Sequence, residues 1–75
     1  MANNKAIGKR LFELRRQYAM TLENVAGWVN TTKQTIYKYE QGEIKNIPLE
    51  KIETLAKFYR VSPAYIVGWE EQKDA

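Results

Sequence analysis

Four side chains between positions 33 and 38 have the types and the spacing needed to read the base edges of duplex DNA. Lys33, Gln34, Tyr37 and Lys38 stand at i, i+1, i+4 and i+5, so a helix would carry them on one face. A lysine can donate to O6 and N7 of guanine, and a glutamine can pair with N6 and N7 of adenine. Taken alone, the pattern also fits an ordinary solvated helix face.

The chain offers little for other kinds of chemistry. Its 75 residues include no cysteine and no histidine, which excludes disulfides, thiolate metal sites and the commonest general base. It has no glycine-rich phosphate loop and no paired carboxylates in an apolar setting. We therefore expect a single domain that is not an enzyme, with no cofactor, no metal and no small-molecule ligand.

Positive charge is concentrated in the first half of the chain. Residues 1–40 carry seven basic and three acidic side chains, within a net charge of +3 for the whole sequence. This distribution indicates an anionic partner. Six basic residues could either contact phosphate or serve as surface charges that aid solubility. Lys45 is the strongest and Lys51 the weakest candidate for a phosphate contact. The six are Lys5, Lys9, Arg10, Arg16, Lys45 and Lys51.

Hydrophobic periodicity predicts five helices and no strand, which makes the fold class all-α. We expect helices over 4–18, 21–29, 33–40, 48–59 and 62–68. No apolar run approaches the roughly 20 residues that cross a bilayer, and no signal segment is visible. We therefore expect a cytoplasmic protein without a membrane partner.

Several residues are suited to begin or end these helices. Pro48 fits the first turn of the fourth helix, because a proline has no N–H to leave unpaired there. Asn30 and the Gln41-Gly42 pair are suited to helix ends. The expected N-caps are Asn3 or Asn4, Thr21, Thr32 and Ser62.

The second and third helices form a predicted helix-turn-helix over residues 21–40. Only residues 30–32 separate them, and the small side chain of Ala26 allows the two helices to approach closely. Val25, Val29 and Ile36 are spaced to face inward. The side chains at 33, 34, 37 and 38 must then point outward.

The arrangement of motifs along residues 6–69 resembles the phage repressor and Cro family, also called the XRE family. The resemblance rests on Ile7-Gly8 with Arg10-Leu11, on Thr21-Leu22-Glu23 with Val25-Ala26, on Lys33 to Ile36 with Lys38 to Glu40 and Gly42, and on Val61-Ser62-Pro63 with Tyr65-Ile66 and Gly68. It is greatest to N-terminal domains of repressors from phages of Gram-positive bacteria. The resemblance implies a compact five-helix lambda-repressor-like DNA-binding domain over 1–69, with 70–75 as a polar tail or the start of a linker.

The resemblance also implies roles for individual residues. Lys33, Gln34 and Lys38 match base-reading positions, and Tyr37 matches a position that reaches bases or backbone. Arg15 with Glu40 matches a structural ion pair. The family often has glutamine where this chain has Leu22, so only a phosphate contact through the backbone N–H groups carries over there. The expected phosphate contacts are Thr21, Leu22, Thr32, Thr35, Lys45 and Asn46.

These matches favour a sequence-specific DNA-binding transcriptional regulator, and most simply a repressor that binds a palindromic operator as a homodimer. The alternative is a protein-interaction module of the antitoxin or adaptor type, which should have an apolar recognition face. Trp28 is predicted to pack on the Ile44 and Ile47 loop, or else to form a self-association patch. A second group is either core or dimer seam: Tyr65, Ile66 and Trp69.

Overall fold

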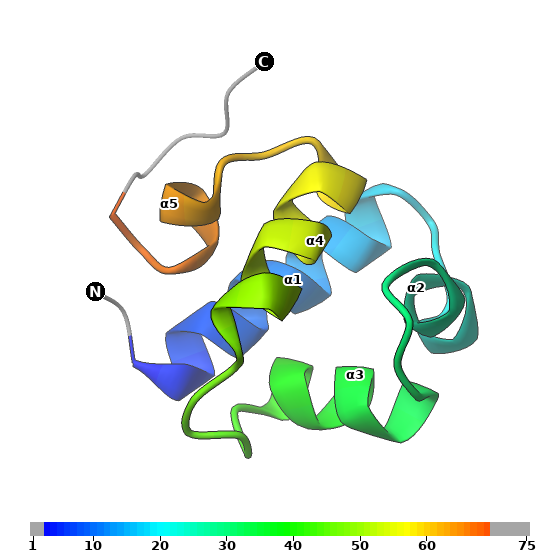
Figure 1. Cartoon of the computed structure of the whole chain (residues 1–75), viewed down its shortest axis with the longest axis horizontal. Helices are drawn as coiled ribbons and strands as arrows, with labels where there is room; N and C mark the ends of the chain where they lie inside the picture. Colours follow the sequence, from blue (N-terminus) through cyan, green and yellow to red (C-terminus); the bar gives the residue numbers. More distant parts are fainter. Residues whose placement is uncertain (1–2, 70–75) are drawn as a thin grey trace.

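Five helices make up the computed structural model, which describes residues 3–69 (Figure 1). Within that range there is no strand, so the all-α, five-helix prediction is confirmed. None of the helices in it is long and apolar enough to cross a membrane. The helices are α1 (Asn4–Gln17), α2 (Leu22–Trp28), α3 (Lys33–Gln41), α4 (Leu49–Tyr59) and α5 (Pro63–Ile66).

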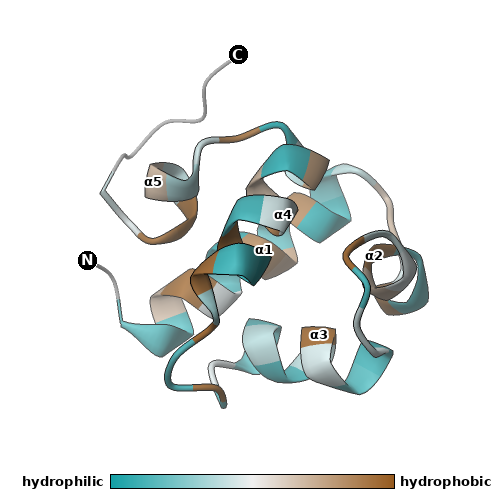
Figure 2. Cartoon of the chain, viewed as in Figure 1, coloured by the Kyte–Doolittle hydropathy of each residue, from teal (hydrophilic) through white to brown (hydrophobic). Residues whose placement is uncertain are grey.

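The core is formed by one apolar side of each helix. In α1 and α4 the apolar residues at helical spacing are buried, with Leu14 and Tyr59 only 1 % exposed. Figure 2 shows α3 as mostly hydrophilic, with one hydrophobic band turned toward α1 and α4. This helix therefore has a single buried side, and its remaining surface is free to meet a partner. The core residues are Ile7, Leu11, Leu14, Val25, Ala26, Val29, Ile36, Tyr39, Ile52, Leu55, Ala56, Tyr59, Val61 and Ile66.

Side chains cap four of the five helices at the positions predicted from the sequence. Asn3 Oδ1 accepts from the N–H of Ala6, at 2.8 Å. Thr21 and Asn24 form a reciprocal capping box, and Thr32 and Ser62 cap α3 and α5. Such caps pair N–H groups that have no partner inside the helix. The starts of both helices of the helix-turn-helix are fixed locally for this reason.

The turn between α2 and α3 depends on Asn30, whose φ is 58°. This left-handed conformation is one that asparagine tolerates better than most residues. The N–H of Thr31 then donates to the carbonyl of Ala26 at 2.9 Å, which closes the end of α2. The four residues between α2 and α3, 29–32, are therefore enough to redirect the chain, one more than the sequence predicted.

Two details differ from the sequence prediction. Pro48 precedes α4 as its N-cap rather than lying in its first turn, with ψ at 139° and its carbonyl accepting from the N–H of Ile52. Tyr18, expected as the last residue of the first helix, lies just after α1 and is 43 % exposed. Its ring stacks on Tyr59 and its hydroxyl donates to the Tyr59 carbonyl at 3.0 Å, so it covers the core from the edge.

Candidate nucleic-acid interface

The helix α3 has two faces with opposite exposure. Ile36, Tyr39 and Glu40 on its inner face are 2 %, 5 % and 7 % exposed. Lys33, Gln34, Tyr37 and Lys38 are all exposed, as the spacing of the inner residues predicts. The structure therefore brings the four predicted base-reading residues together on one outward surface. We call these four residues the reading face.

An ion pair attaches the inner face of α3 to α1. The guanidinium of Arg15 donates to both carboxylate oxygens of Glu40, at 2.7 and 2.9 Å, and also to the carbonyl of Met20 at 3.1 Å. The hydrogen bond to Glu40 raises the pKa of Arg15. A two-pronged contact of this kind fixes orientation as well as distance. It holds the C-terminal half of α3 against the end of α1.

The main chains of α1 and α3 approach closely at Gly8. A Cβ at this position would meet the carbonyl oxygen of Glu40 and would lie 2.6 Å from that of Tyr39. Only glycine permits this approach, because a methyl group would overlap main-chain atoms that cannot rotate away. The packing of α3 on α1 is therefore set by the backbone as well as by side chains.

An open hollow with a volume of about 300 Å³ lies on the reading face. Leu22, the first residue of α2, contributes one wall of it. The four residues of the reading face contribute the rest. We call this feature the reading-face hollow.

Threonine hydroxyls beside the reading face are partly engaged within the protein. Thr32 Oγ1 accepts from the N–H of Thr35, and the two hydroxyls are joined by a hydrogen bond of 3.0 Å. That bond uses the hydrogen of one hydroxyl, so the other can still be donated to a phosphate. Thr21 Oγ1 accepts from the N–H of Asn24 in the same way and also keeps its own hydrogen.

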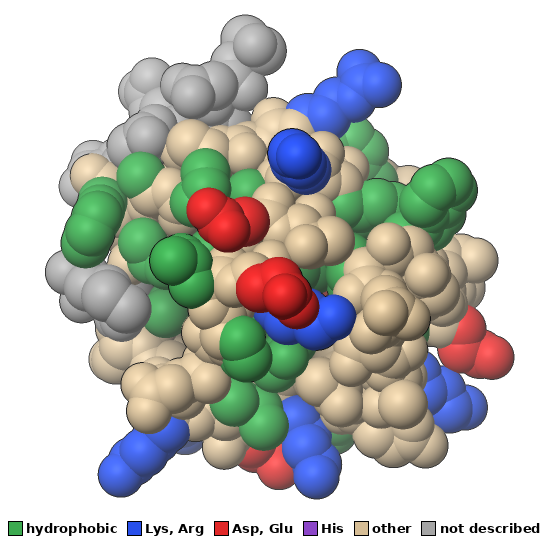
Figure 3. All heavy atoms as spheres, in the orientation of Figure 1, with side chains coloured by type: hydrophobic (Ala, Val, Ile, Leu, Met, Phe, Trp, Pro, Cys, Tyr) green, Lys and Arg blue, Asp and Glu red, His purple; other side chains and the backbone are tan. Residues whose placement is uncertain are grey.

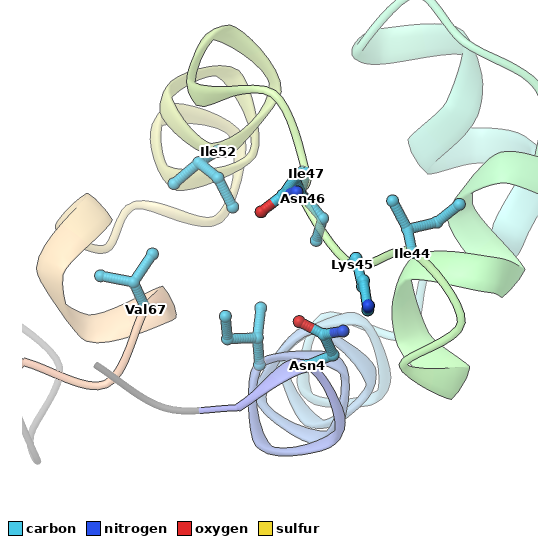
Figure 4. A pocket seen from close by; sticks show the side chains of 8 residues that line it. Asn4, Ile44, Lys45, Asn46, Ile47, Ile52 and Val67 are labelled. Atoms are coloured by element: carbon cyan, nitrogen blue, oxygen red, sulfur yellow. The ribbon is translucent and has the colours of Figure 1, made fainter.

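Lys45 and Asn46 are exposed in the loop between α3 and α4. The loop and the start of α1 enclose a small cavity with a volume of about 80 Å³, lined also by Asn4 and Ile7 (Figure 4). This volume suits a few water molecules rather than a drug-sized ligand. Lys and Arg side chains project from the lower edge of the molecule, where this loop and α3 lie (Figures 1 and 3).

Lys51 has a contact that the sequence gave no sign of. Its ammonium group donates to the carbonyls of Val29 and Asn30, at 2.9 and 3.1 Å. Positive charge is favourable at this place, because unpaired carbonyls make the C-terminal end of a helix electronegative. Lys51 therefore links α4 to the turn of the helix-turn-helix.

The predicted packing of Trp28 on the Ile44 and Ile47 loop is wrong. The indole is 72 % exposed, and its aromatic neighbour is Phe58 of α4, with ring centroids 6.1 Å apart. Ile44 and Ile47 pack against the core instead. The aromatic contact of Trp28 is therefore with α4 and not with this loop.

The three residues left open near the C-terminal end differ in their burial. Ile66 is fully buried and belongs to the core, whereas Trp69 is 70 % exposed. Tyr65 is partly buried, and the guanidinium of Arg10 lies 4.8 Å from its ring centroid. Phe12, which had no predicted role, lies under the guanidinium groups of Arg15 and Arg16.

Comparisons with known proteins agree with this architecture. A family model described as a helix-turn-helix domain matches residues 6–66. The HTH-type transcriptional regulator YobD of Bacillus subtilis (strain 168), itself uncharacterised, is 36 % identical over 66 residues; the match covers 88 % of this chain and 58 % of YobD. The chain therefore spans little more than half the length of this curated relative.

Two solved structures share the fold. The P22 c2 repressor, in complex with the synthetic operator 9T, superposes with a TM-score of 0.78 at 20 % identity, covering 85 % of this chain and 96 % of that one. The restriction-modification controller protein C.AhdI of Aeromonas hydrophila gives a TM-score of 0.76 at 26 % identity, covering 83 % and 92 %.

The family match and these structures agree with the motifs in the sequence. The chain belongs to the helix-turn-helix family, and its domain is of the type found in XRE-like phage repressors. The curated relative that shares this domain is described as an HTH-type transcriptional regulator.

Proposed function

We propose that this domain binds duplex DNA sequence-specifically and regulates transcription, most simply as a repressor at a palindromic operator. The observation that carries the proposal is the reading face: two lysines, a glutamine and a tyrosine exposed together on a helix whose opposite side is buried. A helix fits the major groove of B-DNA, where lysine and glutamine can pair with base edges. Lys33, Gln34, Tyr37 and Lys38 are the proposed base-reading residues.

The composition of the reading face favours DNA over a protein partner. Cores of protein interfaces are depleted in lysine and enriched in large apolar anchors. Here two of the four side chains are lysines, and a third is an amide. A protein-interaction module of the antitoxin or adaptor type would place an apolar surface at the same position.

Phosphate contacts would hold the reading face in the groove. Thr32 and Thr35 stand at the start of α3, and Lys45 and Asn46 follow its other end. With Thr21 and Leu22 at the start of α2, they would contact the backbone on the two sides of the groove. Such contacts fix the register of the protein without selecting sequence.

Binding as a dimer would place two reading faces in successive major grooves. Half-sites of helix-turn-helix dimers lie about one helical turn apart, ~34 Å. Trp69, which is 70 % exposed, supports a seam near the C-terminal end. We expect Trp69→Ala to lower the fraction of dimer on DNA, measured by analytical ultracentrifugation with a half-site duplex and a full palindrome. If the unaltered protein and Trp69→Ala form the same fraction of dimer on the full palindrome, the seam lies elsewhere.

The experiment that tests the proposal is selection from a pool of random duplex DNA at two salt concentrations, followed by sequencing. We expect an enriched palindrome whose binding weakens at the higher salt concentration. The reason is that each neutralised phosphate contributes about −0.9 to the slope of log affinity against log salt concentration, here called the salt slope. Binding without enrichment would contradict sequence-specific recognition. Absence of binding at both concentrations would direct the search to protein partners.

Matched variants assign the contacts. Lys33→Ala and Gln34→Ala should each cost ~1–3 kcal/mol at one base pair and relax the preference there. Lys45→Ala should weaken binding to all sequences and reduce the salt slope by about 1. Lys57→Ala is the control, because Lys57 lines a different hollow on the outer side of α4 with Glu50 and Glu53. It should leave sequence preference and affinity unchanged.

A further inference from the structure

The reading-face hollow combines apolar walls with a polar rim. Leu22 and the ring of Tyr37 supply apolar surface, and the stems of Lys33 and Lys38 add to it. Leu22 is partly buried against the core, whereas Tyr37 is 49 % exposed. Lys33, Lys38 and Gln34 also line the hollow, so their charged and amide ends can lie at its edge while their stems add apolar surface.

This combination fits one group of the DNA major groove better than it fits a protein segment. Each base pair presents donors and acceptors there, but the apolar group is the 5-methyl of thymine. The ammonium groups around the hollow complement the negative charge of DNA. An apolar peptide would instead require two lysines to be desolvated at its rim, which is costly.

We propose that Leu22 and Tyr37 determine specificity by enclosing the 5-methyl group of a thymine. The inference rests on the proposed function, and it names the base feature that this part of the site recognises. Gln34 lines the same hollow and can pair with N6 and N7 of adenine. Both contacts therefore favour A·T base pairs at the positions they reach.

The expected effect follows from the size of the group. Burying one methyl or methylene contributes roughly 0.8 kcal/mol, which is about fourfold in affinity. Removing the methyl from the contacted thymine should therefore weaken binding about fourfold in each half-site. Hydrogen bonding by the base stays unchanged, because deoxyuridine keeps the O4 and N3 groups of thymidine.

The test uses the duplex enriched from the random pool. Each thymidine is replaced in turn by deoxyuridine, and affinity for the whole chain is measured by fluorescence anisotropy at one salt concentration. We expect deoxyuridine at one position in each half-site to lower the affinity about fourfold. At that position the loss should fall below about 1.5-fold for Leu22→Ala and for Tyr37→Ala, whereas Tyr37→Phe should retain it.

Leu49→Ala is the matched control. Leu49 is also the first residue of its helix, α4, and is 69 % exposed, but it lies outside the reading-face hollow. Its removal should leave the deoxyuridine effect unchanged. Thermal melting of each variant checks folding, and Tyr37→Ala keeps the test valid if Leu22→Ala destabilises the domain.

Three outcomes are decisive in different ways. A methyl effect that disappears in both hollow variants supports the inference. An enriched operator without a methyl effect, or with an effect that neither variant alters, overturns the inference and leaves the proposed function standing. If no sequence is enriched, the proposed function fails and this inference fails with it.

Discussion

The two faces of α3 are built by different kinds of interaction. The inner face is held by Ile36, by the Glu40 ion pair and by main-chain contact at Gly8. The outer face consists of exposed side chains grouped around one hollow. Because the two sets of residues do not overlap, stability and base recognition should respond to different substitutions.

The strongest test of this separation is Arg15→Met. The substitution leaves the Glu40 carboxylate, whose side chain is 2 % exposed, without its two charged hydrogen bonds. Removing one partner of a buried ion pair costs about 3–5 kcal/mol, so we expect a loss near 4 kcal/mol in urea unfolding. Arg16→Met, at an exposed position with no ion pair to Glu40, should change stability by less than about 0.5 kcal/mol. Similar losses in both variants would break the comparison.

Gly8→Ala should have the next largest effect. The added methyl would overlap the carbonyls of Tyr39 and Glu40, so α1 and α3 must separate. We expect a loss of roughly 3 kcal/mol in chemical denaturation.

Gly27→Ala is the natural control for this substitution. Apart from its chain neighbours and the backbone of its own helix, no atom lies within 4 Å of a Cβ placed on Gly27, the last residue but one of α2. It should stabilise the domain by about 0.5–1 kcal/mol, since alanine is the better helix former. A tolerated Gly8→Ala would show that side chains alone set the position of α3.

Lys51→Met sharpens the comparison, because Lys51 supports the turn of the helix-turn-helix from α4 and lies outside both faces of α3. The substitution keeps the aliphatic stem and removes the donation to Val29 and Asn30. We expect a loss of about 1–2 kcal/mol in stability and weaker DNA binding with an unchanged salt slope. A slope reduced by about 0.9 would identify Lys51 as a phosphate contact instead. Lys57→Met serves as the control for both readouts.

The smallest effect at neutral pH concerns the tyrosines of the buried side. Burial raises the pKa of Tyr59, with a further contribution from the negative charge of Glu40, and burial also raises the pKa of Tyr39. In the unfolded chain both phenols ionise near pH 10. The stabilisation is therefore complete below pH ~9 and is lost above pH ~10. Each tyrosine contributes at most about 1.4 kcal/mol per pH unit, and only up to its pKa in the folded protein.

Urea unfolding between pH 8 and pH 11.5 measures this dependence. Tyr59→Phe should reduce the alkaline slope, and adding Tyr39→Phe should reduce it further. If the slope of the double variant equalled that of the unaltered protein, the alkaline loss would have another origin.

Local pattern made much of this architecture predictable. Thr21 and Thr32 are capping residues directly before apolar periodic segments, and Asn30 suits the left-handed turn between them, so the boundaries of α2 and α3 followed from neighbouring residues. Ile36 and Tyr39 fixed the inner side of α3, and the outward positions of Lys33 and Gln34 then followed geometrically.

Contacts between distant segments were not predictable in the same way. Lys51 reaches a carbonyl 22 residues earlier in the chain, and no periodicity records such a contact. Trp28 was assigned to the wrong neighbour because its helix face did not reveal which element lies beside it. The reading-face hollow likewise depends on how Leu22 of α2 is placed beside α3, which is set by tertiary packing.

The close approach at Gly8 has a consequence for how this domain can change. Since main-chain atoms position α3 there, its orientation does not depend on which side chains it displays to the outside. The outward residues can therefore be exchanged as a cassette while the scaffold stays in place. Successive sequences, whether selected in nature or designed, could acquire new operator preferences in this way without a new solution to the packing of the core.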